Sequence, residues 1–262
     1  MNLDLKHKRA LVCGSTQGIG KAVAMELAAM GANVILLARN EDALKKTKAE
    51  LSTDKGQQHS YLAVDFSYPE ELKKVVHHYI QRQGTINILV NNTGGPPAGP
   101  IHSAKVEEFL SAFNNHLICN HILAQACIEG MKNAGYGRII NIISTSVKQP
   151  LQGLGVSNTI RAAVANWSKT LSNEIAMYGI TVNNVLPGAT NTTRLSNIIE
   201  NKSSRTGTNT EEIKKEMLHE IPAKRFAEAA EIANAVAFLA SPAAAYINGI
   251  NLPVDGGRTS CL

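Results

Sequence analysis

The stretch that decides the fold covers residues 9–20 and reads RALVCGSTQGIG. Its first five residues are mostly apolar and predict a buried strand, and an amphipathic helical pattern begins at Gly18. Between the two, glycines at positions 14, 18 and 20 permit a tight turn and a close approach of phosphate to the backbone, and the N-terminus of the following helix favours anions. A glycine-rich string alone would also fit an ordinary turn. Its place between a strand and a helix predicts a dinucleotide-binding site.

Outward from this stretch, strand-like and helix-like segments alternate along the chain. The sequence predicts strands at 9–13, 33–37, 61–64, 86–90, 138–143, 180–186 and 250–252, and helices at 18–30, 41–51, 69–82, 106–132, 156–178 and 227–239. This order indicates an α/β fold, a Rossmann-type doubly wound parallel sheet with helices on both faces. No linker, repeat or low-complexity tract divides the chain, so we expect a single domain over residues 1–262. Ligands of such sheets bind at the carboxyl ends of the strands.

Composition and charge narrow the classes of function. The 262 residues are 44% hydrophobic and 18% charged, and the net charge of +5 is spread along the chain, which argues against a nucleic-acid partner. No apolar run of signal-peptide length follows the polar N-terminus, and none has the roughly 18 residues of a membrane span. The four cysteines form no CxxC motif, and His77 and His78 have no third residue at metal-ligand spacing. We therefore expect a cytoplasmic protein without a membrane, nucleic-acid or metal partner.

The end of the second predicted strand bears on the choice of cofactor. An acidic residue there would accept hydrogen bonds from a ribose 2′-hydroxyl, whereas Arg39 can pair with a 2′-phosphate. An exposed arginine beside a loop is the alternative interpretation. The sequence therefore predicts NADP (NADPH) as the preferred cofactor, with NAD possible.

Further motifs occur in a fixed order along the whole chain. They are Asp65 after the third predicted strand, NNTG at 91–94, LPG at 186–188, IPAKRF at 221–226, FLAS at 238–241 and VDGG at 254–257. With these motifs the chain resembles the short-chain dehydrogenase/reductase family, and it is most similar to the 3-oxoacyl-(acyl-carrier-protein) reductase branch. The resemblance implies an oxidoreductase that reduces a carbonyl or oxidises an alcohol of a small-molecule substrate. It also implies a homotetramer in which the long helices starting near Val106 and Val156 pack across subunit interfaces.

The resemblance also implies which residues hold the cofactor. The pyrophosphate would be held by Gly14, Ser15, Gly18 and Ile19, and the adenine by Asp65. Asn91 and Gly94 would line the path of the ribose, and Pro187, Gly188 and Thr192 would flank the nicotinamide carboxamide. Thr93 departs from the family pattern, which usually has alanine there.

The residues expected to carry the chemistry depart further from the family pattern. Family members use an asparagine, a serine, a tyrosine and a lysine, and Ser144 stands at the serine position, where it would polarise the carbonyl. The tyrosine position holds Ser157, the lysine position holds Arg161, and the asparagine position holds His116. A serine hydroxyl is a far weaker acid than a phenol, and arginine stays protonated, so neither can replace its counterpart in proton transfer.

His116 has two interpretations at this stage. Histidine titrates near neutral pH, so His116 could serve as the general acid, or it could be a core histidine satisfied by its neighbours. Our leading hypothesis makes His116 or a bound water the proton source, while Arg161 anchors the ribose or an anionic substrate. The rival hypotheses are a catalytically silent nucleotide-binding sensor or scaffold, and a structural subunit of a hetero-oligomer.

Two surface regions complete the expectations. Residues 193–220 are polar and charged, and by resemblance they form a substrate lid. Reductases of the acyl-carrier branch would dock their acidic partner through basic residues at two positions that hold Gly135 and Tyr178 here. The sequence therefore leaves acyl carrier protein doubtful as a partner.

Overall fold

The central sheet of the computed structural model, which describes residues 1–261, contains seven parallel strands. The strands are β1 (Arg9–Cys13), β2 (Asn33–Ala38), β3 (Ser60–Ala63), β4 (Ile88–Asn91), β5 (Gly137–Ile142), β6 (Ile180–Pro187) and β7 (Asn251–Val254). They lie in the order β3-β2-β1-β4-β5-β6-β7. The first three strands are added toward one edge of the sheet and the last four toward the other, so the switch point lies between β1 and β4. The predicted doubly wound Rossmann-type fold is confirmed.

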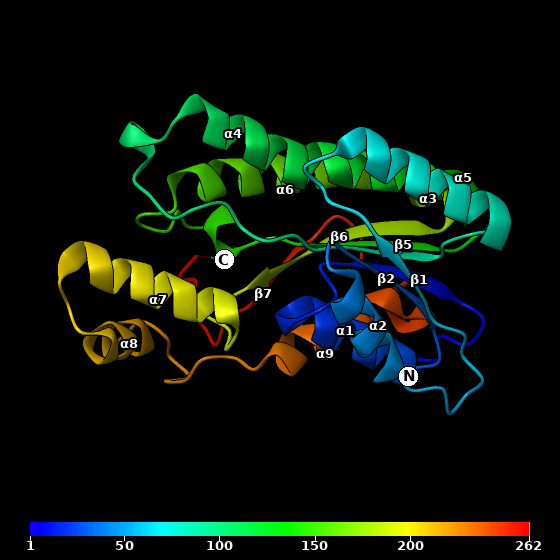
Figure 1. The fold of residues 1–262 in the computed structure, drawn as a ribbon. Helices are drawn as coiled ribbons and strands as arrows, with labels where there is room; N and C mark the ends of the chain where they lie inside the picture. Colours follow the sequence, from blue (N-terminus) through cyan, green and yellow to red (C-terminus); the bar gives the residue numbers. More distant parts are fainter. Residues whose placement is uncertain (262) are drawn as a thin grey trace.

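Helices cover both faces of this sheet (Figure 1). One face carries α1 (Gly18–Ala29), α2 (Glu41–Ala49) and α9 (Ala229–Ala240), and the other carries α3 (Pro69–Gln83), α4 (Val106–Phe113), α5 (Cys119–Ala134) and α6 (Gly155–Ile175). Short 3₁₀ turns occur at Ile101–Ser103, Thr145–Val147, Ala176–Tyr178 and Pro242–Ala244. No helix within residues 1–261 combines the length and apolarity needed to cross a membrane.

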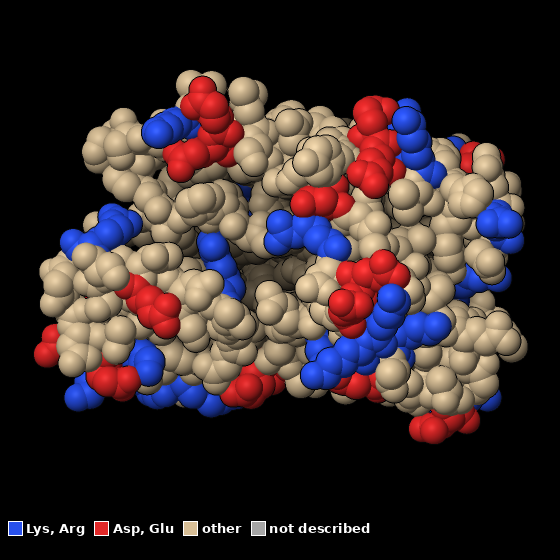
Figure 2. Space-filling view, viewed as in Figure 1, with Lys and Arg blue, Asp and Glu red and all other residues tan. Residues whose placement is uncertain are grey.

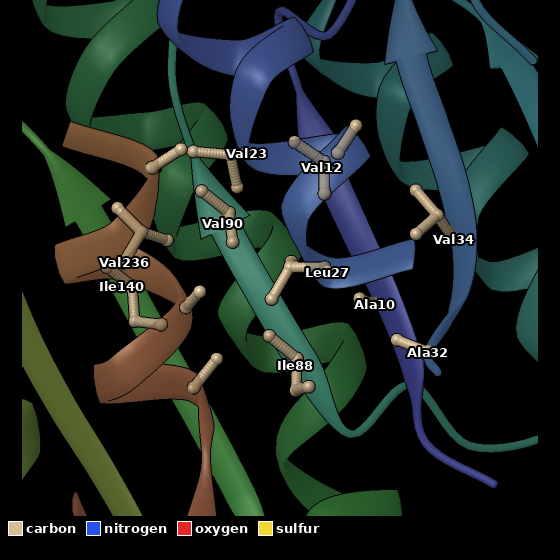
Figure 3. Close-up of a cluster of buried hydrophobic side chains, with 14 of the residues drawn as sticks. Ala10, Val12, Val23, Leu27, Ala32, Val34, Ile88, Val90, Ile140 and Val236 are labelled. Atoms are coloured by element: carbon tan, nitrogen blue, oxygen red, sulfur yellow. The ribbon is translucent and has the colours of Figure 1, made fainter. Parts of the chain in front are cut away.

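Strand alternation divides the core into two layers. Ala10 and Val12 of β1 face a cluster shared with α1 and α9, whereas Leu11 and Cys13 face a cluster shared with α3 and α5. Figure 3 shows the first cluster, in which Val23 and Leu27 of α1 lie against the strands. Because successive residues of β1, β2 and β4 are buried on both faces, these three strands read as nearly continuous apolar runs.

Local signals explain several helix ends. Asn40 caps α2, its Oδ1 accepting a hydrogen bond of 2.9 Å from the Ala43 N–H. Pro69 stands in the first turn of α3, and Gly84 ends that helix with φ +87°. The observed ends of the predicted elements differ from the expected ones by a few residues at most.

The stretch at 193–220, predicted as a polar and charged substrate lid without assigned secondary structure, forms two helices. These are α7 (Thr193–Thr206) and α8 (Thr210–His219), which extend beside the carboxyl ends of the strands (Figure 1). Leu195 and Ile199 of α7 pack with Ile213 of α8 in a small separate cluster. The sequence analysis did not divide this stretch into helices, because its few apolar residues stand among many polar and charged ones.

Candidate active site

A cleft of about 1490 Å³ opens at the carboxyl ends of the strands. It is larger than the roughly 300–1,000 Å³ of a typical small-molecule site, so it has room for a dinucleotide and a second molecule. Figure 2 shows the surface hollowed at the middle of this face, with basic side chains on both sides of the hollow. The cleft is lined by the loops that follow β1, β2, β4, β5 and β6, and by α7.

The glycine-rich loop after β1 forms one wall of this cleft. Gly14 has φ +59°, and a Cβ there would lie 2.7 Å from the backbone oxygen of Asn92. A Cβ at Gly20 would lie 2.1 Å from the backbone oxygen of Gly14, so α1 packs directly against the turn. The first turn of α1 has neither a side-chain cap nor an acidic residue. Close backbone approach and uncapped N–H groups suit a pyrophosphate, and Gly14, Gly18 and Ile19 all line the cleft.

Ser15 lies behind the loop rather than in the cleft. Its side chain is fully buried, and its Oγ accepts a hydrogen bond of 3.1 Å from the Leu37 N–H. This contact ties the loop to β2. The hydroxyl-bearing residue of the loop that lines the cleft is Thr16, which the sequence analysis did not single out.

Asn91 also lies away from the cleft. It begins a row of four amides, at residues 91, 141, 184 and 251, that runs across β4, β5, β6 and β7 in register. In this amide row each side-chain NH₂ donates to the next side-chain oxygen, at 2.8, 2.9 and 2.8 Å in turn. The Oδ1 of Asn91, at the end of the row, is buried without a hydrogen-bond partner.

The next residue, Asn92, faces the site that Asn91 was expected to line. Its Nδ2 donates to the backbone oxygen of Cys13 at 3.2 Å, and Asn92, Thr93 and Gly94 all line the cleft. A Cβ at Gly94 would meet no atom within 4 Å, so the glycine leaves the space beside it open.

Arg39 and Asp65 meet at the ends of β2 and β3. The Arg39 Nη1 lies 3.7 Å from the Asp65 Oδ2, and the Ser67 N–H donates to the other carboxylate oxygen at 2.9 Å. The Arg39 side chain is 76% exposed and lines the cleft. It is therefore accessible to a phosphate, as the cofactor prediction requires.

The turn from β6 into α7 closes another side of the cleft. A Cβ at Gly188 would lie 2.7 Å from the Asp255 Cα, so only glycine lets this turn pass so close to the end of β7. A Cβ at Gly18 would lie 3.2 Å from the Thr192 Cγ2, which brings the start of α7 directly over the glycine-rich loop. Pro187, Gly188 and Thr192 all line the cleft.

Ser144, Ser157 and Arg161 line the same cleft. Ser144 follows β5, and its Oγ accepts a hydrogen bond of 3.1 Å from the Ser146 N–H. Ser157 and Arg161 lie one turn apart on α6, and each is 8% exposed. The Arg161 Nη1 donates to the Ile142 backbone oxygen at 3.0 Å, whereas its buried Nε has no partner. Burial, with a smaller contribution from the charge of Arg194, lowers the pKa of Arg161 to about 10, so the guanidinium remains charged at neutral pH.

His116 is buried behind the cleft. It is 2% exposed and does not line the cleft. Its Nδ1 shares a hydrogen bond of 2.5 Å with the Oγ1 of Thr93, and Thr93 lines the cleft. Burial, together with the charges of Arg161 and Arg194, lowers the pKa of His116 to about 2. The imidazole is therefore neutral at physiological pH, in the environment of a core histidine.

A π-helical turn, Asn114–Ile118, carries this histidine. It joins α4 to α5 without a break, and the Cys119 N–H donates to the Asn114 carbonyl five residues earlier. The predicted helix at 106–132 is thus continuous but contains one wide turn. Such turns are frequent at functional sites.

Arg194, in the first turn of α7, is a cleft residue that the sequence analysis missed. Its Nη2 donates to the Pro96 backbone oxygen at 2.8 Å, and a Cβ at Gly95 would lie 2.9 Å from that nitrogen. The same loop is tied to the start of α6, because the Gly99 N–H donates to the Gly153 oxygen at 2.7 Å. Nothing in the local sequence distinguishes Arg194 from a solvated arginine.

Other titratable clusters do not form a second site. Within residues 1–261, no three histidine, cysteine or acidic side chains come together as metal ligands. The buried thiols of Cys119 and Cys127 have pKa values raised to about 12 by burial, so they are unreactive at neutral pH.

Comparisons with known proteins agree with this geometry. Residues 14–259 match the family model described as enoyl-(acyl carrier protein) reductase. The chain is 35% identical over 257 residues to the 3-oxoacyl-(acyl-carrier-protein) reductase FabG of Vibrio cholerae, covering 97% of this chain and 98% of that protein. It is 28% identical over 254 residues to the NADPH-dependent reductase BacG of Bacillus subtilis, with the same coverage of both chains.

A solved structure extends the likeness to three dimensions. L-sorbose reductase from Gluconobacter frateurii, complexed with NADPH and L-sorbose, superimposes with a TM-score of 0.92 at 32% identity, and the match covers 100% of both chains. The family model and the relatives each span almost the whole chain. The chain therefore belongs to the short-chain dehydrogenase/reductase family of oxidoreductases.

Proposed function

We propose that this protein is an NADPH-dependent oxidoreductase that reduces the carbonyl group of a small molecule, or oxidises the corresponding alcohol. The observation that carries the proposal is that the glycine-rich loop and the hydroxyls of Ser144 and Ser157 line one continuous cleft. Relatives with NADPH in their names, BacG and L-sorbose reductase, support the choice of cofactor.

The residues present fit a phosphorylated dinucleotide. The backbone of the glycine-rich loop would hold the pyrophosphate, and a Cβ at Gly14 or Gly20 would obstruct the turn. Arg39 would hold the 2′-phosphate, Asp65 the adenine, and Thr192 the carboxamide. When bound, NADPH supplies a hydride to the carbonyl carbon of the substrate.

The hydroxyls of the cleft would complete the reduction. Ser144 would donate a hydrogen bond to the carbonyl oxygen, which gains negative charge and finally takes up a proton as the alcohol forms. Because the pKa of His116 is about 2, a protonated imidazole is not available as the acid. We therefore assign the proton to a water in the cleft beside Thr93, with neutral His116 as a positioning residue that orients the Thr93 hydroxyl.

We further propose that Ser157 and Arg161 occupy the positions that hold tyrosine and lysine in the family pattern. Their places one turn apart on α6, both facing the cleft with Ser144, support this. Losing a positioned acid typically lowers a rate by about 10²–10⁴. We therefore expect turnover to be slow for the family.

The helical pair α7–α8 is proposed as the substrate lid. It borders the cleft through Arg194, Leu195 and Met217, and the Arg194 hydrogen bond to Pro96 joins it to the facing loop. Since its own apolar cluster is small, this pair can move without disturbing the two main core layers.

Two measurements test the proposed function. Fluorescence titration should show tighter binding of NADPH than of NADH, and a panel of ketones and aldehydes should then include compounds that drive NADPH oxidation. Ser144→Ala should leave NADPH binding intact and lower turnover about 10²-fold or more. Ser103→Ala, which removes an exposed hydroxyl outside the cleft, should change neither quantity. Absence of binding to either nucleotide would refute the proposal.

A second candidate, a nucleotide-binding protein without catalysis, is favoured by one observation. Among the residues described around the cleft there is no tyrosine, so the phenol that serves as acid in the family pattern is lacking. The double variant Ser157→Tyr with Arg161→Lys separates the two candidates. Turnover that appears only in this variant would support the silent protein, whereas measurable turnover in the wild type would support the enzyme.

A further inference from the structure

Among the charged side chains that line the cleft, basic ones outnumber acidic ones. Its lining includes Arg39, Arg161, Arg194, Lys202, Arg205 and Arg258, but only two acidic residues, Asp65 and Glu220. Both acids are engaged, with Arg39 and Arg258 respectively, and Lys202 pairs with Glu216 at 2.8 Å. Within residues 1–261 the remaining cations of the lining, Arg161, Arg194 and Arg205, form no ion pair.

Arg161 is the most confined of these three. A guanidinium has five N–H donors, and a buried charge is costly unless it is paired or fully hydrogen-bonded. In Arg161, which is 8% exposed, one nitrogen donates to the Ile142 oxygen, and the buried Nε has no partner. The side chain thus brings an uncompensated positive charge to the wall of the cleft.

Arg194 adds a second positive charge from α7. Its guanidinium packs against Gly95 and donates through Nη2 to the Pro96 oxygen, which is a neutral acceptor. Arg161 and Arg194 both line the cleft, and the charge of Arg194 is the smaller of the two causes that lower the pKa of Arg161, so the two like charges act on one another. An oxyanion in the cleft would relieve this repulsion and accept hydrogen bonds from both groups.

The phosphates of the cofactor have other proposed partners. The pyrophosphate is assigned to the loop after β1 and the 2′-phosphate to Arg39 at the end of β2. Arg161 instead lies on α6, one turn from Ser157. A ribose hydroxyl could accept a hydrogen bond from Arg161, but it is neutral and would leave the buried charge of Arg161 uncompensated.

We propose that Arg161 and Arg194 form an oxyanion-binding subsite, so that the substrate carries a carboxylate or phosphate group near its reacting carbonyl. This inference rests on the proposed function and names the substrate class. Neutral ketones and aldehydes would enter the same cleft without this anchor. They would therefore bind more weakly than anionic compounds of the same skeleton.

Calorimetric titration of the protein–NADP⁺ complex tests the subsite without turnover, because the oxidised cofactor cannot reduce a ketone. Two matched pairs serve as probes, phenylpyruvate with its methyl ester, and dihydroxyacetone phosphate with dihydroxyacetone. At least one anionic member should bind roughly tenfold or more tightly than its neutral partner, and which pair does so identifies carboxylate or phosphate. Equal binding within both pairs, or no binding of either anion at millimolar concentration, overturns the subsite.

Variants identify the residues involved. Arg194→Gln should reduce the preference for the anion roughly tenfold and leave NADP⁺ affinity unchanged, and Arg161→Gln should reduce it as well. Lys214→Gln removes a positive charge from the same helical pair outside the cleft lining, and it should preserve the preference. A preference that survives in Arg194→Gln contradicts the assignment.

The cofactor titration keeps the two proposals separate. If NADP⁺ fails to bind the wild type, the proposed function falls, and the anion titrations repeated on the protein alone still decide whether Arg161 and Arg194 bind an oxyanion. If NADP⁺ binds and the anions do not, only the subsite falls.

Discussion

Arg39 shows how one exposed side chain can set cofactor choice. It faces Asp65 at 3.7 Å, a distance at which the carboxylate orients the guanidinium loosely and leaves donors for a phosphate. We predict that Arg39→Ala weakens NADPH binding roughly 10- to 100-fold and changes NADH binding little, since only NADPH carries the 2′-phosphate. Fluorescence titration with both nucleotides measures the change. Lys48→Ala, at an exposed position of α2 outside the cleft, is the matched control.

Thr93 and His116 form a hydrogen-bonded pair, and this contact accounts for the presence of both unusual residues. Both depart from the family pattern expected from the sequence, and the structure pairs them through one hydrogen bond. Sequence reasoning identified each departure but not their contact, because 23 residues separate them and the direction of each side chain depends on packing. The same limit applies to Ser15 and Asn91, whose polar groups bond within the core. The glycines were easier to predict, since the turn itself requires them.

Burial of His116 has a thermodynamic consequence. Its pKa is about 2 in the folded protein and about 6.5 in the unfolded chain, so below pH 6.5 the unfolded chain binds more protons. Stability must therefore fall as the pH is lowered from about 6.5 toward about 2. Between pH 8 and pH 5 this one group should account for a loss of about 2 kcal/mol.

Urea unfolding at pH 8 and pH 5 checks this expectation. His116→Asn should show a smaller loss of stability between the two pH values than the wild type, by about 2 kcal/mol. His77→Asn, which replaces an exposed histidine of α3, should retain the wild-type pH dependence. Identical pH dependence in wild type and His116→Asn would mean that folding does not lower the pKa of His116, so that its imidazole is protonated at pH 5 in the folded protein as well.

At the scale of elements, the amide row fixes four strands relative to one another. Each amide lies directly opposite the next in the parallel ladder, so a slip of one residue in any strand would break the row. The strands themselves were predictable from their apolar runs. Their pairing partners and the amide contacts depend on sheet order, which no local pattern contains. For α7 and α8 the difficulty was different, since their apolar residues, although helically spaced, are few among polar and charged ones.

The amide row can be tested with Asn184, which connects β5 to β7 through its two neighbours. Asn184→Val should destabilise the protein by about 1–3 kcal/mol, because it leaves the Asn251 oxygen without its donor and removes the acceptor of Asn141. Adding Asn251→Val removes one of these orphaned groups. The double variant should therefore cost less than the sum of the two single variants, as measured by chemical denaturation. Strict additivity would show that the amides do not act as a unit.

At the scale of the whole molecule, α4 presents an apolar face to solvent. Val106, Leu110 and Phe113 are 67%, 59% and 39% exposed and recur at helical spacing. Contiguous exposed apolar residues mark association surfaces, and the resemblance implied contacts between subunits through this helix. We propose that this face joins subunits of a homotetramer.

Light scattering coupled to gel filtration measures the assembly directly. The wild type should elute as a tetramer, and Leu110→Glu should produce smaller species because it buries a charge in the proposed interface. Met25→Glu places the same charge at an exposed apolar position of α1, outside both long helices, and should leave the assembly intact. A monomeric wild type would refute this use of α4.

The wide turn at Asn114–Ile118 makes the position of His116 depend on chain length as well as on residue type. An α-helix advances about 100° per residue, so a chain one residue shorter before position 116 could run from α4 into α5 as plain α-helix with the imidazole rotated away from Thr93. A one-residue deletion between Val106 and His116 would therefore abolish the hydrogen bond between Thr93 and His116, even though both side chains remained in the protein. The contact between Thr93 and His116 can therefore be gained or lost through insertions and deletions in this helix as well as through substitutions.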